Sequence, residues 1–171
     1  MLIGHFFNGI KTEYKNHYFS GISFNSSKCK KNHIFFAIKG NKIDGNKFIN
    51  HAIQKGAKTI VSTLKFEGVK NNILFINTTN VRQLLSEFAY KLNKNIPNNL
   101  IAVTGTNGKS SIADFYFQIL SLNKKKVASI GTLGVKTNNS VKRMSNTTVD
   151  PIELSKILND LKGKNINNVI L

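Results

Sequence analysis

The sequence predicts an α/β protein with parallel sheets in two successive units. Short apolar and aromatic segments alternate with amphipathic segments of helical period, which is typical of parallel sheets with connecting helices. The segment "NKNIPNNL", residues 93–100, interrupts this alternation and indicates a boundary near residue 98. The glycine-containing segment "GTNGKSS", residues 105–111, stands between a predicted strand and a predicted helix. That is the usual place of a phosphate-binding loop.

The first unit, residues 1–97, contains four segments with the apolar and aromatic character of strands: 18–24, 33–40, 59–62 and 72–76. Between the second and third, residues 47–55 are expected to form a helix with Phe48, Ala52 and Ile53 on one face, followed by a turn at Gly56. Residues 80–93 form the clearest amphipathic helix. Its apolar residues repeat with helical period: Val81, Leu84, Leu85, Phe88 and Leu92.

The second unit, residues 98–171, is expected to contain strands at 100–103, 126–131 and 167–171. A helix beginning around Lys109 carries a stripe that we expect to be buried: Ile112, Phe115, Tyr116, Ile119 and Leu120. A second helix has strong start signals, since Asp150 is an N-cap residue, Pro151 follows and Glu153 completes a capping pattern. Its apolar face comprises Leu154, Ile157, Leu158 and Leu161.

Composition excludes several classes of protein. At 171 residues and 40% hydrophobic content the chain suits one ordinary soluble domain or two small ones. No apolar run approaches the roughly 20 residues of a membrane span, and the N-terminus has no secretory pattern. The single cysteine, Cys29, cannot form an internal disulfide, so we expect a cytoplasmic protein. The lysines beside Cys29 would favour its thiolate, but an incidental cysteine is the commoner case.

The formal net charge of +17 invites a nucleic-acid interpretation. The distribution argues against it, because lysines are spread along the chain and arginine, the preferred reader of phosphate forks and guanine edges, occurs only at Arg82 and Arg143. We therefore expect no nucleic-acid partner. A small polyanion such as a nucleotide would still be attracted.

The segment "VTGTNGKSS" departs from the common phosphate-loop spacing, which would need glycine at Val103. Its chemistry still favours phosphate. Gly105 and Gly108 permit unusual backbone angles, and the following helix points unpaired N–H groups into the loop. Lys109 supplies a mobile positive charge, and the Ser110 hydroxyl suits Mg²⁺. The alternative is a glycine-rich turn with a surface lysine.

Three segments resemble the Mur ligase family. "TGTNGKSS" resembles its compact T-G-T-N-G-K-[ST] loop, residues 21–61 resemble its N-terminal domain, and "SNTTVDPIEL" resembles the N-T-T-P-D-P-x-E-L of the members that add the third amino acid of the peptidoglycan precursor. The resemblance runs from Gly21 to Leu171. Four positions depart from the family pattern: Asn25 stands for Asp, Ser27 for Arg, Asn32 for a turn Gly and Val149 for Pro.

The resemblance implies residue roles, with ATP and Mg²⁺ as cofactors. Lys109 would be catalytic and Ser110 would hold the metal. The ATP-binding set would be Gly105, Thr106, Asn107, Gly108, Lys109, Ser110 and Ser111. The substrate-binding set would be Phe24, Ser26, Asn41, Lys42, Ile43, Asn146, Thr147 and Thr148. Structural alternatives remain: a turn hydroxyl for Ser26, a solvated side chain for Lys42, and helix-start punctuation for 146–148.

The resemblance also implies the organisation and the reaction. Residues 1–97 would be a small uridine-binding domain for the UDP substrate. Residues 98–171 would begin a P-loop-type parallel-sheet ATPase domain that is truncated, with the C-terminal domain absent and the chain alone inactive. The reaction would join diaminopimelate or L-lysine to UDP-N-acetylmuramoyl-L-alanyl-D-glutamate through an acyl phosphate, with the UDP-N-acetylmuramoyl dipeptide and an amino acid as the partners of a monomer.

Two rival functions stay open. One is another Mur-type or folylpolyglutamate-type ligase. The other is a nucleotide- or nucleic-acid-binding module without catalysis. No metal site is expected from the histidines, because His5, His17, His33 and His51 show no ligand spacing.

Overall fold

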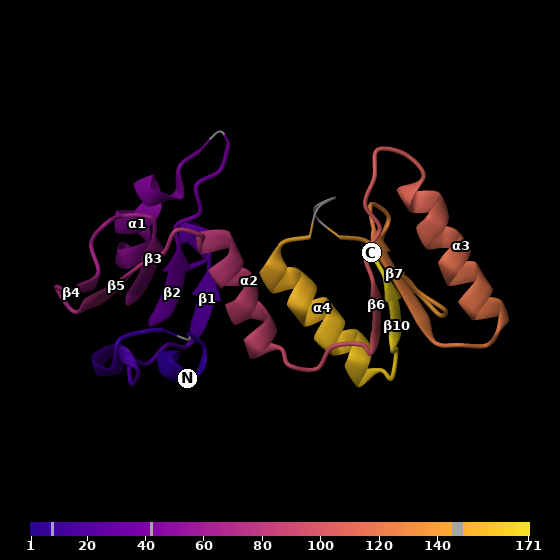
Figure 1. Cartoon of the computed structure of the whole chain (residues 1–171), viewed down its shortest axis with the longest axis horizontal. Coiled ribbons are helices and arrows are strands. Elements are labelled where there is room, and N and C mark those ends of the chain that lie inside the picture. Colours follow the sequence, from indigo (N-terminus) through magenta and orange to yellow (C-terminus); the bar gives the residue numbers. More distant parts are fainter. Residues whose placement is uncertain (8, 42, 145–148) are drawn as a thin grey trace. The chain divides into compact units, whose positions relative to one another are not determined.

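Two five-stranded sheets, one in each half of the chain, form the framework of the computed structural model (Figure 1). It describes residues 1–171 except 8, 42 and 145–148. The chain divides into two compact units, Met1–Leu92 and Asn93–Leu171. The predicted α/β class with parallel sheets is confirmed.

The first sheet has the strand order β1-β2-β3-β5-β4, and β4 alone runs antiparallel to its neighbour. The strands are β1 (Gly21–Ser23), β2 (His33–Phe36), β3 (Thr59–Ser62), β4 (Gly68–Lys70) and β5 (Ile73–Asn77). The four predicted strands are all present. Strand β4 was not predicted, because a three-residue edge strand with two exposed residues is too short to show a periodicity.

Helices cover both faces of this sheet because neighbouring residues of a strand point to opposite sides. Phe35 packs in a core cluster with Ile49 and Ala52 of helix α1 (Ile49–Gln54). Its neighbour Phe36 lies 5.5 Å, between ring centroids, from Phe88 of helix α2 (Val81–Leu92). Four short 3₁₀ turns complete the unit: η1 (Ile3–His5), η2 (Thr12–Tyr14), η3 (Ser26–Lys28) and η4 (Gly45–Phe48).

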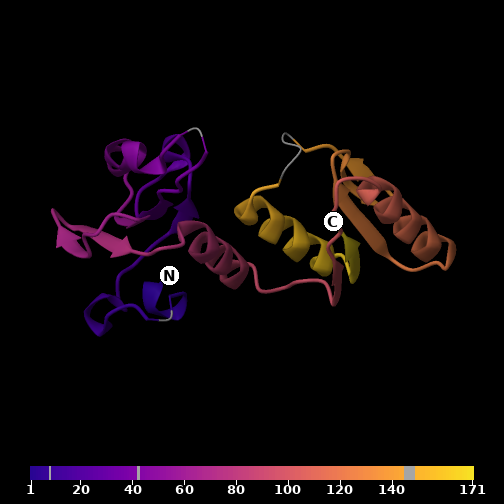
Figure 2. The same cartoon turned by 45° about the horizontal axis from the view of Figure 1, so that its top comes forward.

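The second sheet has the order β6-β10-β7-β8-β9, with β6, β10 and β7 parallel. Its strands are β6 (Asn99–Ile101), β7 (Val127–Gly131), β8 (Gly134–Thr137), β9 (Val141–Lys142) and β10 (Asn168–Ile170). Helices α3 (Lys109–Leu122) and α4 (Pro151–Gly163) lie on opposite faces of this sheet (Figures 1 and 2). Asp150 caps α4 as predicted, since its Oδ1 accepts bonds from the backbone N–H groups of Ile152 and Glu153, both at 2.9 Å.

The predicted buried stripe of α3 is wrong. Ile112, Phe115 and Ile119 are 53%, 63% and 59% exposed, and Tyr116 and Leu120 are only half-buried. The buried residue of α3 is Phe117. The helix is apolar on more than one side, so its periodicity could not decide which side meets the sheet.

No helix among the described residues is long and apolar enough to cross a membrane.

Candidate nucleotide-binding site

The loop between β6 and α3 lies at the carboxyl edge of the parallel strands, where α/β folds place their ligands. Backbone pairing continues past the strand, because the Val103 N–H donates to the Leu171 carbonyl at 2.7 Å. The chain then turns outward, and every residue from Thr104 to Ile112 is exposed. Gly105 and Gly108 adopt φ angles of +150° and +79°. Other residues rarely adopt such angles, so these two glycines are required by the turn.

Helix α3 begins at Lys109 with Gly108 as its N-cap, and no side chain of the described residues caps it. Its first intrahelical bond runs from the Ile112 N–H to the Gly108 carbonyl at 3.0 Å. The backbone N–H groups of residues 109–111 therefore face solvent at the positive end of the helix dipole. Uncapped, exposed N–H groups of this kind are suited to bind an anion.

The Lys109 side chain folds back over the loop, where its Nζ donates a hydrogen bond to the Gly105 carbonyl oxygen. This contact keeps the ammonium beside the exposed N–H groups. A bound phosphate would offer a stronger, charged acceptor at the same place. The loop thus brings together all seven residues predicted to bind ATP: Gly105, Thr106, Asn107, Gly108, Lys109, Ser110 and Ser111.

The chain's own contribution to a magnesium site is small. Ser110 is exposed in the first turn of α3, where its hydroxyl oxygen is a hard ligand. Among the described residues no group of three His, Cys, Asp or Glu side chains could hold a metal ion. The donor set therefore fits Mg²⁺ only as a partner of bound phosphate, which is how Mg²⁺ usually binds.

The residues of the first unit that were predicted to bind substrate lie in loops that follow the adjacent parallel strands β1 and β2. Phe24 comes directly after β1 and is 39% exposed, and Ile43 belongs to the loop after β2 and is 61% exposed. That loop is closed by the Gly40 N–H, which donates to the Ile43 carbonyl at 2.9 Å, with Asn41 at its exposed tip. Lys42, Asn146, Thr147 and Thr148 lie outside the described residues.

Ser26 is buried, and its Oγ lies 3.0 Å from Nδ1 of His51 on α1. This pair leaves no signal in the sequence, because the two residues are far apart in the chain and belong to different elements. The neighbouring Cys29 is also buried, and burial raises the pKa of its thiol. A raised pKa disfavours the thiolate, so Cys29 is poorly suited to act as a nucleophile.

A contact between β8 and α3 was also not predicted from the sequence. Lys136 of β8 donates from Nζ to Asp114 Oδ1 at 3.0 Å and lies 4.4 Å above the centroid of the Phe117 ring. The hydrogen bond from Lys136, followed by that from Gln118, lowers the pKa of the Asp114 carboxyl. Asp114 is therefore ionised at neutral pH and available as the partner of Lys136.

Comparisons with known proteins place both units in one family. Residues 18–102 match the description "Mur ligase family, catalytic domain", and residues 103–171 match "Mur ligase middle domain". The UDP-N-acetylmuramoyl-L-alanyl-D-glutamate–2,6-diaminopimelate ligase of Rickettsia prowazekii is 38% identical over 157 residues, which are 90% of this chain and 32% of that protein. The UDP-N-acetylmuramoyl-L-alanyl-D-glutamate–2,6-diaminopimelate ligase 2 of Clostridium acetobutylicum is 32% identical over 158 residues, which are 88% of this chain and 32% of that protein.

Solved structures agree with this likeness. A UDP-N-acetylmuramoyl-L-alanyl-D-glutamate–2,6-diaminopimelate ligase matches with a TM-score of 0.74 and 25% identity over 95% of this chain and 34% of that one. A MurF ligase from Thermotoga maritima, solved in complex with ADP, has the same fold with a TM-score of 0.55 and 24% identity over 88% of this chain and 31% of that one. The chain spans about a third of the length of the curated relatives it matches.

Proposed function

This chain belongs to the Mur ligase family, and on that premise we propose that it acts in an ATP-dependent amide-ligation step of peptidoglycan precursor synthesis. The observation that carries the proposal is the exposed glycine loop before α3, whose N-terminus has no side-chain cap among the described residues, with the Lys109 side chain folded back to the Gly105 carbonyl. The two curated relatives described above are named for 2,6-diaminopimelate. We therefore take diaminopimelate, rather than lysine, as the added amino acid.

The proposed reaction has two steps. An oxygen of the substrate's glutamyl carboxylate attacks the γ-phosphorus of ATP, so that a carboxyl O–P bond forms, the bond to the β,γ-bridging oxygen breaks and ADP leaves. The amine of the incoming amino acid then attacks the acyl carbon. A C–N bond forms, the bond between the acyl carbon and the phosphate oxygen breaks, inorganic phosphate leaves with that bond's electron pair, and the nitrogen loses a proton.

The chain's own residues act on the phosphates. The loop N–H groups hold phosphate oxygens, and Lys109 exchanges its bond to the Gly105 carbonyl for one to a phosphate oxygen as negative charge shifts toward the leaving ADP. A magnesium ion, when bound, supplies further charge neutralisation, and Ser110 is the residue proposed to hold it. Catalysis in this scheme is positioning and electrostatics, without a nucleophile from the protein.

The first unit is proposed to bind the UDP moiety, as the domain of residues 1–97. Phe24 and Ile43 present exposed apolar side chains and Asn41 a polar one, all in loops that follow adjacent strands. Exposed apolar groups beside an amide suit stacking and hydrogen bonding to a base. Lys42 and residues 146–148 belong to the proposal through the family resemblance alone, as does a monomeric state. A cytoplasmic location is proposed from the single cysteine, Cys29, which cannot form an internal disulfide.

Amide NMR titration of the chain tests the two halves of the proposal separately. Mg-ATP is expected to shift the amides of residues 105–111, and UDP-N-acetylmuramoyl-L-alanyl-D-glutamate those of Phe24, Ser26 and Asn41. Absence of both sets of shifts at millimolar ligand overturns the proposal. Binding of duplex DNA that outcompetes Mg-ATP and weakens steeply with salt would favour the nucleic-acid-binding alternative instead.

A further inference from the structure

The second unit contains a lysine-rich hollow at the edge of the sheet opposite the phosphate loop. Three segments line it: Lys124–Lys126 just before β7, Lys164 and Ile166 just before β10, and the β8–β9 turn of residues 137–140. The β8–β9 turn reaches this edge because β8 runs antiparallel to β7, with Thr137 opposite Ala128. All three segments thus meet at the amino ends of the parallel strands, whereas the phosphate loop follows a carboxyl end. The hollow is a separate feature of about 560 Å³.

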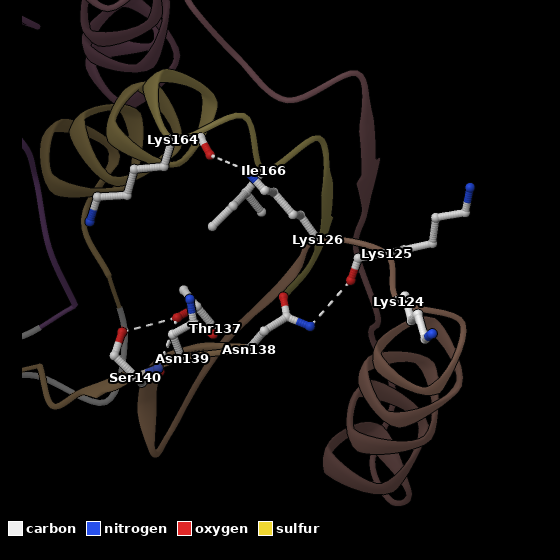
Figure 3. Close-up of a pocket in the computed structure, with 9 residues that line it drawn as sticks. All are labelled: Lys124, Lys125, Lys126, Thr137, Asn138, Asn139, Ser140, Lys164 and Ile166. Carbon is white, nitrogen blue, oxygen red and sulfur yellow. Dashed lines mark hydrogen bonds between the residues drawn. The ribbon is translucent and has the colours of Figure 1, made fainter.

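The lining is strongly cationic. Four of its nine residues are lysines and none is acidic. Neither of the ion pairs that the described residues form, Lys11 with Glu67 and Lys136 with Asp114, neutralises any of these lysines. Lys126 extends across the hollow and donates from Nζ to the Lys164 carbonyl at 3.4 Å (Figure 3). The Lys125 side chain points outward in the same view, so its flexible stem must swing to reach a ligand.

Helix ends offer a competing explanation for these lysines. Helices α3 and α4 both finish here, at Leu122 and Gly163, and a helix C-terminus carries roughly half a negative charge that basic side chains offset. Two such ends amount to about one negative charge. Four lysines therefore leave a surplus of about three positive charges, which the helix ends do not account for.

The floor of the hollow is held in place by hydrogen bonds. Asn138 accepts at Oδ1 from the Val127 N–H at 3.0 Å and donates from Nδ2 to Ser121 Oγ at 3.1 Å and to the Lys125 carbonyl at 3.2 Å. Thr137 Oγ1 and Ser140 Oγ lie 2.9 Å apart in the same turn. These bonds fix the β8–β9 turn against the start of β7, so the hollow has a defined polar wall that includes two hydroxyls (Figure 3).

We propose that this hollow is a second anion site, which binds a small phosphate-bearing ligand with at least two negative charges. Lysine ammonium groups are point charges suited to phosphate, and the lining lacks the arginine fork that planar carboxylates prefer. The volume suffices for a small molecule. The proposal does not depend on the ligase assignment, since neither Lys109 nor the loop contributes to it.

Residue-resolved NMR titration with inorganic pyrophosphate tests the site. The amides of residues 137–140 are expected to shift in addition to those of the phosphate loop. The double variant Lys126→Gln, Lys164→Gln is expected to weaken binding read at residues 137–140 by about tenfold or more, because two charge-assisted contacts are lost. Binding read at residues 105–111 is expected to stay unchanged.

The matched control is Lys70→Gln, Lys156→Gln, which removes the same charge from two exposed positions outside the hollow. It is expected to leave binding at residues 137–140 within about twofold of the parent. Equal weakening by both double variants would reduce the effect to the general attraction of a chain with net charge +17 and overturn the site. Shifts confined to residues 105–111 would overturn it as well.

Discussion

Replacement of Lys109 by alanine isolates the contribution of its ammonium to nucleotide binding. The side chain is exposed, and among the residues that the structure describes its bonding partner is the Gly105 carbonyl, within the same loop. Loss of that surface bond costs on the order of 1 kcal/mol or less, and alanine is a good helix former, so folding stability is expected to change little. A charge-assisted contact to phosphate contributes about 1.5–3 kcal/mol. Lys109→Ala should therefore weaken Mg-ATP binding by about 10- to 150-fold, measured by calorimetry.

The control for this variant is Lys156→Ala, which removes one exposed positive charge from α4 in the same unit. Both variants lower the net charge of the chain by one, so the difference between their dissociation constants reports the position of the lost ammonium beside the phosphates. Thermal unfolding of both should match the parent. If Lys109→Ala binds Mg-ATP as tightly as Lys156→Ala, the ammonium makes no phosphate contact and the assignment of the loop is refuted.

Three further predictions concern stability. Phe88 is fully buried among four phenylalanine rings at 5.5–6.5 Å between centroids, so Phe88→Ala should lower the free energy of unfolding, measured by urea denaturation, by about 3–5 kcal/mol. The control Phe66→Ala changes a side chain that is 49% exposed and should lower it by about 1 kcal/mol. Equal losses of stability in the two variants would contradict the burial argument. Asp150→Ala removes the acceptor of two backbone N–H groups and should cost about 1 kcal/mol in thermal unfolding, with no change meaning that the cap is dispensable. Burial lowers the pKa of both His17 and His33, so the folded state favours their neutral forms. The free energy of unfolding should therefore fall as the pH drops below about 6.5 toward the folded pKa values. The double variant His17→Gln, His33→Gln should flatten this pH dependence, and an unchanged slope would mean that other groups cause it.

Local chemistry made parts of the fold predictable. The strand Thr59–Ser62 was found with its observed bounds because a β-branched, apolar run comes shortly after a glycine turn, and Gly56 does adopt a φ of +103°. The start of α4 was found because an Asp-Pro pair with Glu153 specifies a cap by itself. In both cases the decisive interactions lie within a few residues of one another.

Long-range contacts were not predictable in the same way. The face of α3 that meets the sheet depends on which strands lie beneath it, and the hairpin of β8 and β9 was missed because its strands have only four and two residues. The loop of residues 105–111 was identified from its local motif, but its links to the rest of the unit were not. Neither the contact of Lys136 with Asp114 nor the lysine-rich hollow corresponds to a residue spacing that could be recognised in the sequence.

The contact between Lys136 and α3 bears on the geometry of both proposed anion sites. An exposed ion pair adds little stability, and a cation over an aromatic ring adds about 0.5–1 kcal/mol. We expect the Lys136 contact to act mainly on the orientation of α3, because Asp114 and Phe117 lie near the middle of this 14-residue helix, which is about 21 Å long. A tilt of about 10° around that point would move each end by about 2 Å. Displacements of about 1 Å can reduce catalytic rates a hundredfold. Lys136, which belongs to no motif, therefore helps to set where the phosphate loop stands at one end of α3 and where the lysine-rich hollow stands at the other.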